Sequence, residues 1–136
     1  MLNEAFSVLV GTSIEHLNRD SYSDIELIRQ GVTADMLANA MTFTGLSRRE
    51  LETVLGVKLR LYDKLLPAIA TERVLMLIST IQAGTEYFGT QDRMLLWLKT
   101  PNQAFANQQP ITLLDTIIGL DMINATIIKL SYGMTA

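Results

Sequence analysis

Beyond residue 30, hydrophobic positions recur at the three- and four-residue spacing of helices that bury one face. In the last such run, Ile123, Ile127, Leu130 and Met134 fall on a single face. Glycine and proline separate the runs, so the connections between them are short. The pattern predicts an all-α chain with helices over residues 34–44, 48–55, 57–66, 71–88, 91–100, 110–118 and 121–132.

Residues at the ends of these runs support the helices. Ser47 and Glu50 have the spacing of a capping box, in which each side chain bonds the other residue's backbone N–H. Gly56 suits the position after a helix end, where left-handed backbone is common. Farther along, Pro110 suits the first turn of a helix, and we expect Gly119 to end that helix.

The first 30 residues show a weaker pattern. "FSVLV" fits either a short strand or the start of a helix, and "NRDSYSD" is typical of a loop. We therefore expect an N-terminal arm over residues 1–30, a helix-turn-helix domain over 31–67 and a C-terminal helical domain over 68–136.

Composition restricts the class of protein. Hydrophobic residues make up 49% of the 136 residues, which is enough to fold rather than stay disordered. The absence of cysteine excludes disulfides, thiolate catalysis and cysteine-ligated zinc. No apolar run reaches the length of a membrane span, and the acidic start differs from the basic start of a signal peptide. We expect a cytoplasmic protein that does not bind a membrane.

Charge is uneven along the chain, whose net charge is −3. The net-basic segment is 45–66, with five basic and three acidic side chains and a glycine between two expected helices. This arrangement suits a helix-turn-helix that contacts DNA phosphates or base edges. The alternative is an amphipathic helix with a solvated charged face, which Asp63 favours because it repels phosphate. The candidate DNA-binding residues are Arg48, Arg49, Lys58, Arg60 and Lys64.

No pattern typical of catalysis is found. His16 is the only histidine, and it lies in the least regular part of the chain. The acidic pairs Glu50/Glu52 and Glu86/Asp92 suit helix-cap and surface positions better than a shared pocket. The sequence has no glycine-rich phosphate loop. We therefore expect no catalytic residue, no metal site and no cofactor in this chain.

Several longer motifs follow one another between about Leu27 and Tyr132. "LIRQGVTADML" and "TGLSRRELETVLGV" precede "ERVLMLISTIQAGTEYFGTQDRMLLWL", which has an arginine-bearing helix, a Phe-Gly turn and a Trp-Leu helix. The most specific are "WLKTPNQAFANQQPITLLDTIIG" and the final "LSYG". In this order and spacing, they resemble bacterial antitoxins of the Xre/MbcA/ParS type, which neutralise RES-domain toxins of type II toxin–antitoxin systems.

The resemblance implies a function that composition does not give. Antitoxins of this type bind the toxin through a C-terminal helical domain, while an Xre-like helix-turn-helix domain supports dimerisation and often operator binding. RES toxins resemble ADP-ribosyltransferases and degrade or use NAD. The resemblance implies that this chain is a homodimer in a hetero-oligomeric complex with a RES toxin. It also implies that the chain blocks the toxin's NAD site with its C-terminal end nearby, and that operator DNA is a further partner.

One departure from the family bears on DNA binding. The family's DNA-reading helix often carries an arginine pair, whereas this sequence has Arg60 and Lys64 with Asp63 between them. The domain is therefore also a candidate for dimerisation alone.

The same resemblance gives candidate toxin-binding residues. Trp97 also suits a buried anchor, and Asn102 suits a turn in which its side chain bonds nearby backbone. Asp115 suits a solvated position, and the tail after the last helix either inserts into the toxin or frays. The candidates are Trp97, Pro101, Asn102, Asp115, Lys129, Tyr132, Gly133 and Met134.

Two other classes of protein are alternatives. One is a stand-alone helix-turn-helix repressor, which would not need the region after residue 89. The other is an adaptor for a different helical partner.

Overall fold

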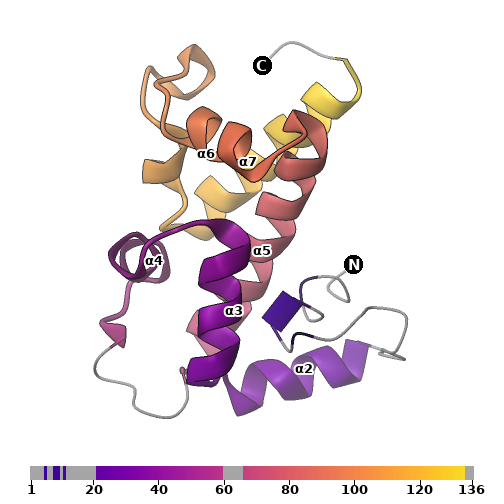
Figure 1. The fold of residues 1–136 in the computed structure, drawn as a ribbon, viewed down its shortest axis with the longest axis vertical. Coiled ribbons are helices and arrows are strands. Elements are labelled where there is room, and N and C mark those ends of the chain that lie inside the picture. The colour runs from indigo at the N-terminus through magenta and orange to yellow at the C-terminus, as the bar shows by residue number, and fades with distance from the viewer. Residues whose placement is uncertain (1–4, 6–7, 10, 12–20, 60–65, 134–136) are drawn as a thin grey trace. The chain divides into compact units, whose positions relative to one another are not determined.

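The computed structural model describes residues 5, 8–9, 11, 21–59 and 66–133, and in this part of the chain it shows helices and no β-strand (Figure 1). The prediction of an all-α fold is confirmed. The elements are α2 (Ser21–Gln30), α3 (Ala34–Thr44), α4 (Arg48–Leu55), α5 (Ala68–Phe88), α6 (Gln91–Leu98), the 3-10 helices η3 (Gln103–Phe105) and η4 (Pro110–Leu113), and α7 (Ile117–Ser131).

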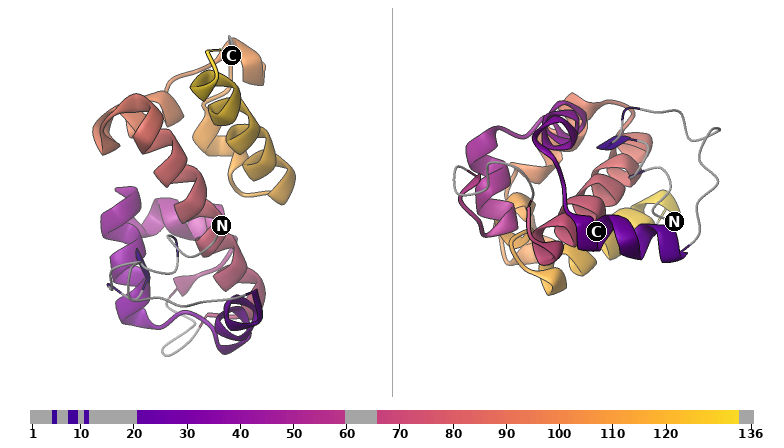
Figure 2. Two further views of the ribbon diagram at one scale, coloured as in Figure 1. Left: turned by 90° about the vertical axis from the view of Figure 1, so that its right-hand side faces the viewer. Right: turned by 90° about the horizontal axis from the view of Figure 1, so that it is seen from below.

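The chain forms two compact units, Met1–Ser79 and Thr80–Ala136. The division falls within α5, whose last turns therefore belong to the C-terminal unit. In Figure 2, the N-terminal unit runs from indigo to rose and the C-terminal unit from red to yellow. The domain boundaries expected from the sequence stay predictions.

Local capping fixes the helices of the N-terminal unit, as the sequence predicts. The Thr33 hydroxyl accepts a hydrogen bond from the Met36 N–H at 3.2 Å and starts α3. Ser47 and Glu50 form the predicted capping box, with bonds of 3.0 and 3.1 Å. Gly56 ends α4 with a φ of 69°, the left-handed conformation that glycine adopts without strain.

The first residues of α2 correct the prediction of a loop over "NRDSYSD". Residues 21–24 form the first turn of this helix, and residues 18–20 of the predicted loop lie outside the described residues. Farther along α2, Leu27 is buried. Leu9 is also buried, and its carbonyl accepts a hydrogen bond from the Asn39 side chain at 2.8 Å.

The helix predicted over 57–66 lies mostly outside the described residues. Leu59 and Leu66, near its two ends, are buried. After Pro67, α5 begins at Ala68, three residues earlier than predicted. The Pro67 carbonyl accepts a hydrogen bond from the Thr71 N–H at 3.0 Å. Pro67 therefore directly precedes the first turn of α5, where a proline is well tolerated.

The core of the C-terminal unit forms where α5, α6 and α7 meet at Gly84. A Cβ added to Gly84 would overlap the Met94 sulfur and lie 3.3 Å from the Cδ1 of Ile127. The lack of a side chain therefore lets α6 and α7 approach α5 closely, and α7 lies beside the end of α5 (Figure 2). The large side chains of this unit that are fully buried are Ile81, Met94, Leu98, Leu114, Leu120, Ile123 and Ile127.

The prediction of a helix from Pro110 to Gly119 is wrong. Pro110 starts only the short η4, and Gly119 lies in the first turn of α7, which begins at Ile117 rather than near Asp121. The Thr116 hydroxyl accepts the Gly119 N–H at 2.9 Å and caps α7. A Cβ on Gly119 would overlap the carbonyl oxygen of Leu113, so glycine is required for close packing and not for ending a helix.

Candidate functional site

Exposed apolar side chains are concentrated in the C-terminal unit. Of nine large hydrophobic residues that are exposed in the described part of the chain, seven lie between residues 87 and 132. Scattered exposed apolar residues are ordinary on protein surfaces, whereas a contiguous group indicates a binding surface. The seven are Tyr87, Leu96, Ile117, Ile118, Met122, Ile128 and Tyr132.

The first group is a stripe along α7. Projection at 100° per residue places five exposed residues of α7 and its C-cap within an arc of roughly 80°. This arc lies on the side opposite the buried Ile123 and Ile127. Ile118 is 75% exposed and Tyr132 is 80% exposed, at the two ends of the helix. We call this set the α7 stripe: Ile118, Met122, Ala125, Lys129 and Tyr132. α7 is therefore apolar on both faces, although only one face is buried in its own unit.

The second group surrounds a shallow apolar pocket of about 440 Å³, which we call the α6 pocket. Arg93, Leu96, Trp97 and Thr100 follow one another at the i, i+3, i+4 and i+7 spacing of one helical side. Phe88, at the end of α5, completes the lining. The pocket lies entirely within the C-terminal unit.

Trp97 is not the fully buried anchor that the sequence suggests. Its side chain is half-buried, while Met94 and Leu98 on the other side of α6 are fully buried. The Trp97 ring lies between two others, 5.5 Å from the Phe88 centroid and 6.1 Å from that of the buried Phe105. Two aromatic rings of the same unit thus lie against the indole, and the Trp97 side chain also lines the pocket.

The loop after α6 is held by Asn102, as predicted for a turn residue. Its Oδ1 accepts the Ala104 N–H at 2.9 Å, and its backbone N–H donates to the Gln108 carbonyl at 3.1 Å. Two residues of this loop, Ala106 and Asn107, have positive φ angles of 55° and 60°. Pro101 lies exposed just before the turn. The geometry is that of a tightly hydrogen-bonded surface loop.

The other candidates for toxin binding are spread over the surface of the C-terminal unit. Lys129 and Tyr132 fall together in the α7 stripe, and Gly133 follows them with a φ of 77°. Asp115 is exposed between η4 and α7. Met134 lies outside the described residues.

Sequence reasoning missed the apolar residues that join these candidates into surfaces. Ile118 and Met122 connect to Tyr132 along α7, and Leu96 and Arg93 flank Trp97 on α6. The signal was in the sequence, because α7 carries apolar residues around most of its circumference. A short helix with a second apolar face either packs against another element or binds a partner.

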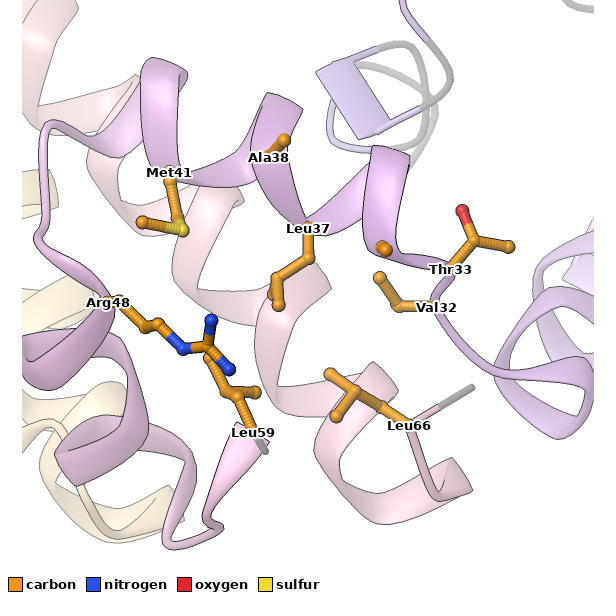
Figure 3. A pocket seen from close by; sticks show the side chains of 9 residues that line it. Val32, Thr33, Leu37, Ala38, Met41, Arg48, Leu59 and Leu66 are labelled. Carbon is orange, nitrogen blue, oxygen red and sulfur yellow. The ribbon is translucent and has the colours of Figure 1, made fainter. Parts of the chain in front are cut away.

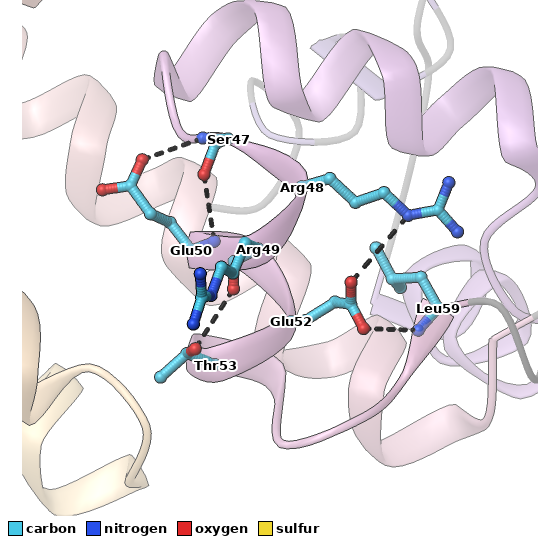
Figure 4. A network of polar contacts seen from close by, with 7 residues as sticks. All are labelled: Ser47, Arg48, Arg49, Glu50, Glu52, Thr53 and Leu59. Atoms are coloured by element: carbon cyan, nitrogen blue, oxygen red, sulfur yellow. Dashed lines mark hydrogen bonds and ion pairs between the residues drawn. The ribbon is translucent and has the colours of Figure 1, made fainter.

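In the N-terminal unit, the described basic candidates are all exposed on or after α4. Arg48 forms an ion pair with Glu52, Nε to Oε1 at 3.9 Å, and the other carboxylate oxygen of Glu52 accepts the Leu59 N–H at 3.2 Å (Figure 4). Arg49 and Lys58 line a shallow hollow of about 430 Å³ that also contains Glu52. Arg60 and Lys64 lie outside the described residues, as do Asp63 and His16.

A smaller pocket of about 250 Å³ lies between α3 and the segments next to it, and the Arg48 side chain points toward it (Figure 3). Leu59 and Leu66, which flank the undescribed residues 60–65, both line this pocket. We assign it no ligand.

In the described ranges, no three His, Asp or Glu side chains lie close enough to hold a metal ion. Among the helices described, none is both long and apolar enough to cross a membrane.

Comparison with known families identifies the C-terminal unit. Residues 83–133 match the family model of the antitoxin Xre/MbcA/ParS C-terminal toxin-binding domain. This confirms, over that segment, the resemblance carried by the sequence motifs. The α6 pocket and the α7 stripe both lie inside the matched residues. Among curated proteins, no match to the chain was found.

Proposed function

We propose that this chain, which carries the toxin-binding domain of an Xre/MbcA/ParS-type antitoxin, neutralises a RES-domain toxin by binding it and blocking its NAD site. The observation that supports this most is the coincidence of the matched segment with the apolar α7 stripe. A partner that covers this stripe removes apolar surface from water, which is the main favourable term in protein association.

The α7 stripe has the pattern of a helix that lies in a groove of its partner. Its anchors at Ile118, Met122, Ala125 and Tyr132 follow the i, i+4, i+7 and i+14 positions of such interfaces. The helix has 15 residues, about 22 Å at 1.5 Å per residue. That length suits a standard interface of roughly 800 Å² per partner.

The end of α7 is the part proposed to reach the toxin's NAD site. Lys129 adds one positive charge to the stripe, and such a charge is attracted to the acidic or phosphate groups of a nucleotide site. Gly133 turns the chain in the left-handed region directly after Tyr132. The residues that follow Gly133 are the segment proposed to obstruct the toxin's NAD site.

Binding is tested by co-purification with the tagged product of the adjacent gene. The wild-type chain should bind, and Ile118→Glu should bind at least tenfold more weakly because it places a charge within an apolar contact. Ile69→Glu is the matched control, since Ile69 is 73% exposed but lies outside the matched segment. Equal binding by both variants would contradict the assignment of the stripe.

Deletion of residues 133–136 tests the blocking role of the tail. The deletion should leave toxin binding unchanged but weaken neutralisation of the toxin. Unchanged neutralisation would exclude a blocking tail.

The proposed complex contains a homodimer of this chain in the cytoplasm, as in the family that the motifs resemble. Sedimentation equilibrium of the chain alone and of the complex gives the stoichiometry. A strictly monomeric chain in both would contradict the homodimer.

Operator binding is a second candidate function, and the exposed Arg48, Arg49 and Lys58 favour it. Glu52 limits the contribution that these basic residues make to DNA binding, because it neutralises part of their charge and pairs with Arg48. If the chain binds its own promoter, its affinity should fall steeply with salt as phosphate counterions are released. Arg49→Ala should reduce the slope of that dependence by about 1, and a salt-independent affinity would rule out phosphate contacts.

A further inference from the structure

The α6 pocket is a second contact site in the same unit, separate from the α7 stripe. We propose that it receives an apolar side chain of the toxin, with a toxin carboxylate beside it that pairs with Arg93. This inference rests on the proposed antitoxin function and adds a specific anchor point and its chemistry.

The pocket is held in shape before any partner binds. Phe105 is buried and meets Trp97 edge to face, with ring planes at 82°, so the indole is supported from the side of its own unit. Phe88 contacts the same indole from the end of α5, and Tyr87 packs edge-on against Phe88 at 4.9 Å. Binding to a fixed aromatic wall loses little side-chain entropy, which favours affinity.

Capping holds the helix that carries the other lining residues. The Thr90 hydroxyl accepts the Arg93 N–H at 3.2 Å at the start of α6, and the Thr100 hydroxyl donates to the Leu96 carbonyl at its end. Between these caps, Leu96 is 69% exposed, although it is bordered by Trp97 and lies over an apolar hollow. A leucine in this position leaves apolar surface in water until another side chain covers it.

The chemistry of the lining defines the partner group. Trp and Arg are the residue types that contribute most binding energy in protein interfaces, especially where they surround a pocket that excludes water. The floor is aromatic and aliphatic, so it fits Leu, Met or Phe rather than a polar side chain. Arg93 is the one charged residue in the lining, and its guanidinium lies near the turn at Gly89. A toxin carboxylate that lies at the Gly89 edge of the pocket therefore complements the charge of Arg93.

The toxin is favoured as the occupant because all five lining residues, from Phe88 to Thr100, fall within the segment that matches a toxin-binding domain. A second copy of this chain is the other occupant to be tested. If a second copy occupies the pocket, a substitution in the pocket changes the oligomeric state of the free chain. If the toxin occupies it, the oligomeric state of the free chain stays the same.

The experiment uses the full-length chain and the purified product of the adjacent gene, with affinity measured by titration calorimetry. Leu96→Glu should weaken binding roughly 30-fold, the size expected for an interface anchor. Arg93→Glu should weaken it about tenfold, and Arg93→Lys should keep most of the affinity because it keeps the charge. Wild-type affinity should fall as salt rises, with a flatter dependence for Arg93→Gln. Ile69→Glu is again the control, and circular dichroism checks that each variant is folded.

Each outcome separates the inference from the proposed function. If wild type binds and Leu96→Glu, folded, binds equally well, the pocket is not a toxin contact while the antitoxin function stands. If Leu96→Glu turns a dimer into a monomer and leaves toxin affinity unchanged, the pocket holds a second copy and the proposal is overturned. If the wild-type chain itself does not bind, both proposals fall.

Discussion

Substitution of Gly119 by alanine tests the contact that places α7 in its unit. An added Cβ would overlap the Leu113 carbonyl oxygen and lie 2.7 Å from the carbonyl carbon, where carbon atoms normally keep about 3.5–4.0 Å. The group that it meets is backbone, which cannot rotate away as a side chain can. η4 and α7 therefore have to move apart by about 1 Å.

The expected loss of stability follows from three terms. Overpacking of this kind costs about 1–3 kcal/mol. Displacement also weakens the Thr116 cap on the Gly119 N–H, worth about 1 kcal/mol. Alanine regains about 1 kcal/mol because it is the better helix former. We expect Gly119→Ala to lower the free energy of unfolding by about 1–3 kcal/mol.

Urea unfolding followed by far-ultraviolet circular dichroism measures this change, at an unchanged m-value. Gly84→Ala is the matched control. Its Cβ would meet side-chain atoms of Met94 and Ile127 rather than backbone, and Met94 can change rotamer, so its loss of stability should be smaller than that of Gly119→Ala. A Gly119→Ala protein as stable as wild type would refute the argument that backbone contact at Gly119 fixes the start of α7.

Three further substitutions test local conformation by urea unfolding. Ala106→Gly should stabilise by about 0.5–1 kcal/mol, since a φ of 55° strains alanine by more than glycine loses in unfolded-state entropy; a lower urea midpoint would contradict this. Ser47→Ala should cost about 1 kcal/mol by removing the cap on the Glu50 N–H, and an unchanged midpoint would mean that the capping box adds nothing. Gly56→Ala should cost about 1 kcal/mol from backbone strain alone, because no atom lies within 4 Å of its added Cβ; a much larger loss would indicate a steric contact.

Helix ends that depend on local chemistry could be predicted from the sequence. The capping box at Ser47 and the glycine after α4 were both confirmed, because their bonds join residues three or four positions apart. Gly119 could not be interpreted in the same way. Its role depends on the approach of Leu113, a contact that exists only once η4 has formed a tight turn.

The candidate site could be predicted only in part from the hydrophobic pattern of the sequence. Periodicity identified the buried face of α7 through Ile123 and Ile127. The exposed face carries residues of the same type, and sequence alone does not say which of two apolar faces the unit covers. Trp97 shows the same difficulty, because a large aromatic residue is usually buried, whereas here it is shared between the core and a surface pocket.

The central claim is that the chain neutralises a toxin, and rescue of growth and cellular NAD tests it most directly. The adjacent gene is expressed alone and together with this chain, and NAD is measured in both cultures. The account predicts that the adjacent gene alone lowers NAD and stops growth, and that co-expression of the wild-type chain restores both. A harmless neighbour, or a toxic one that the folded chain does not rescue, would contradict the claim.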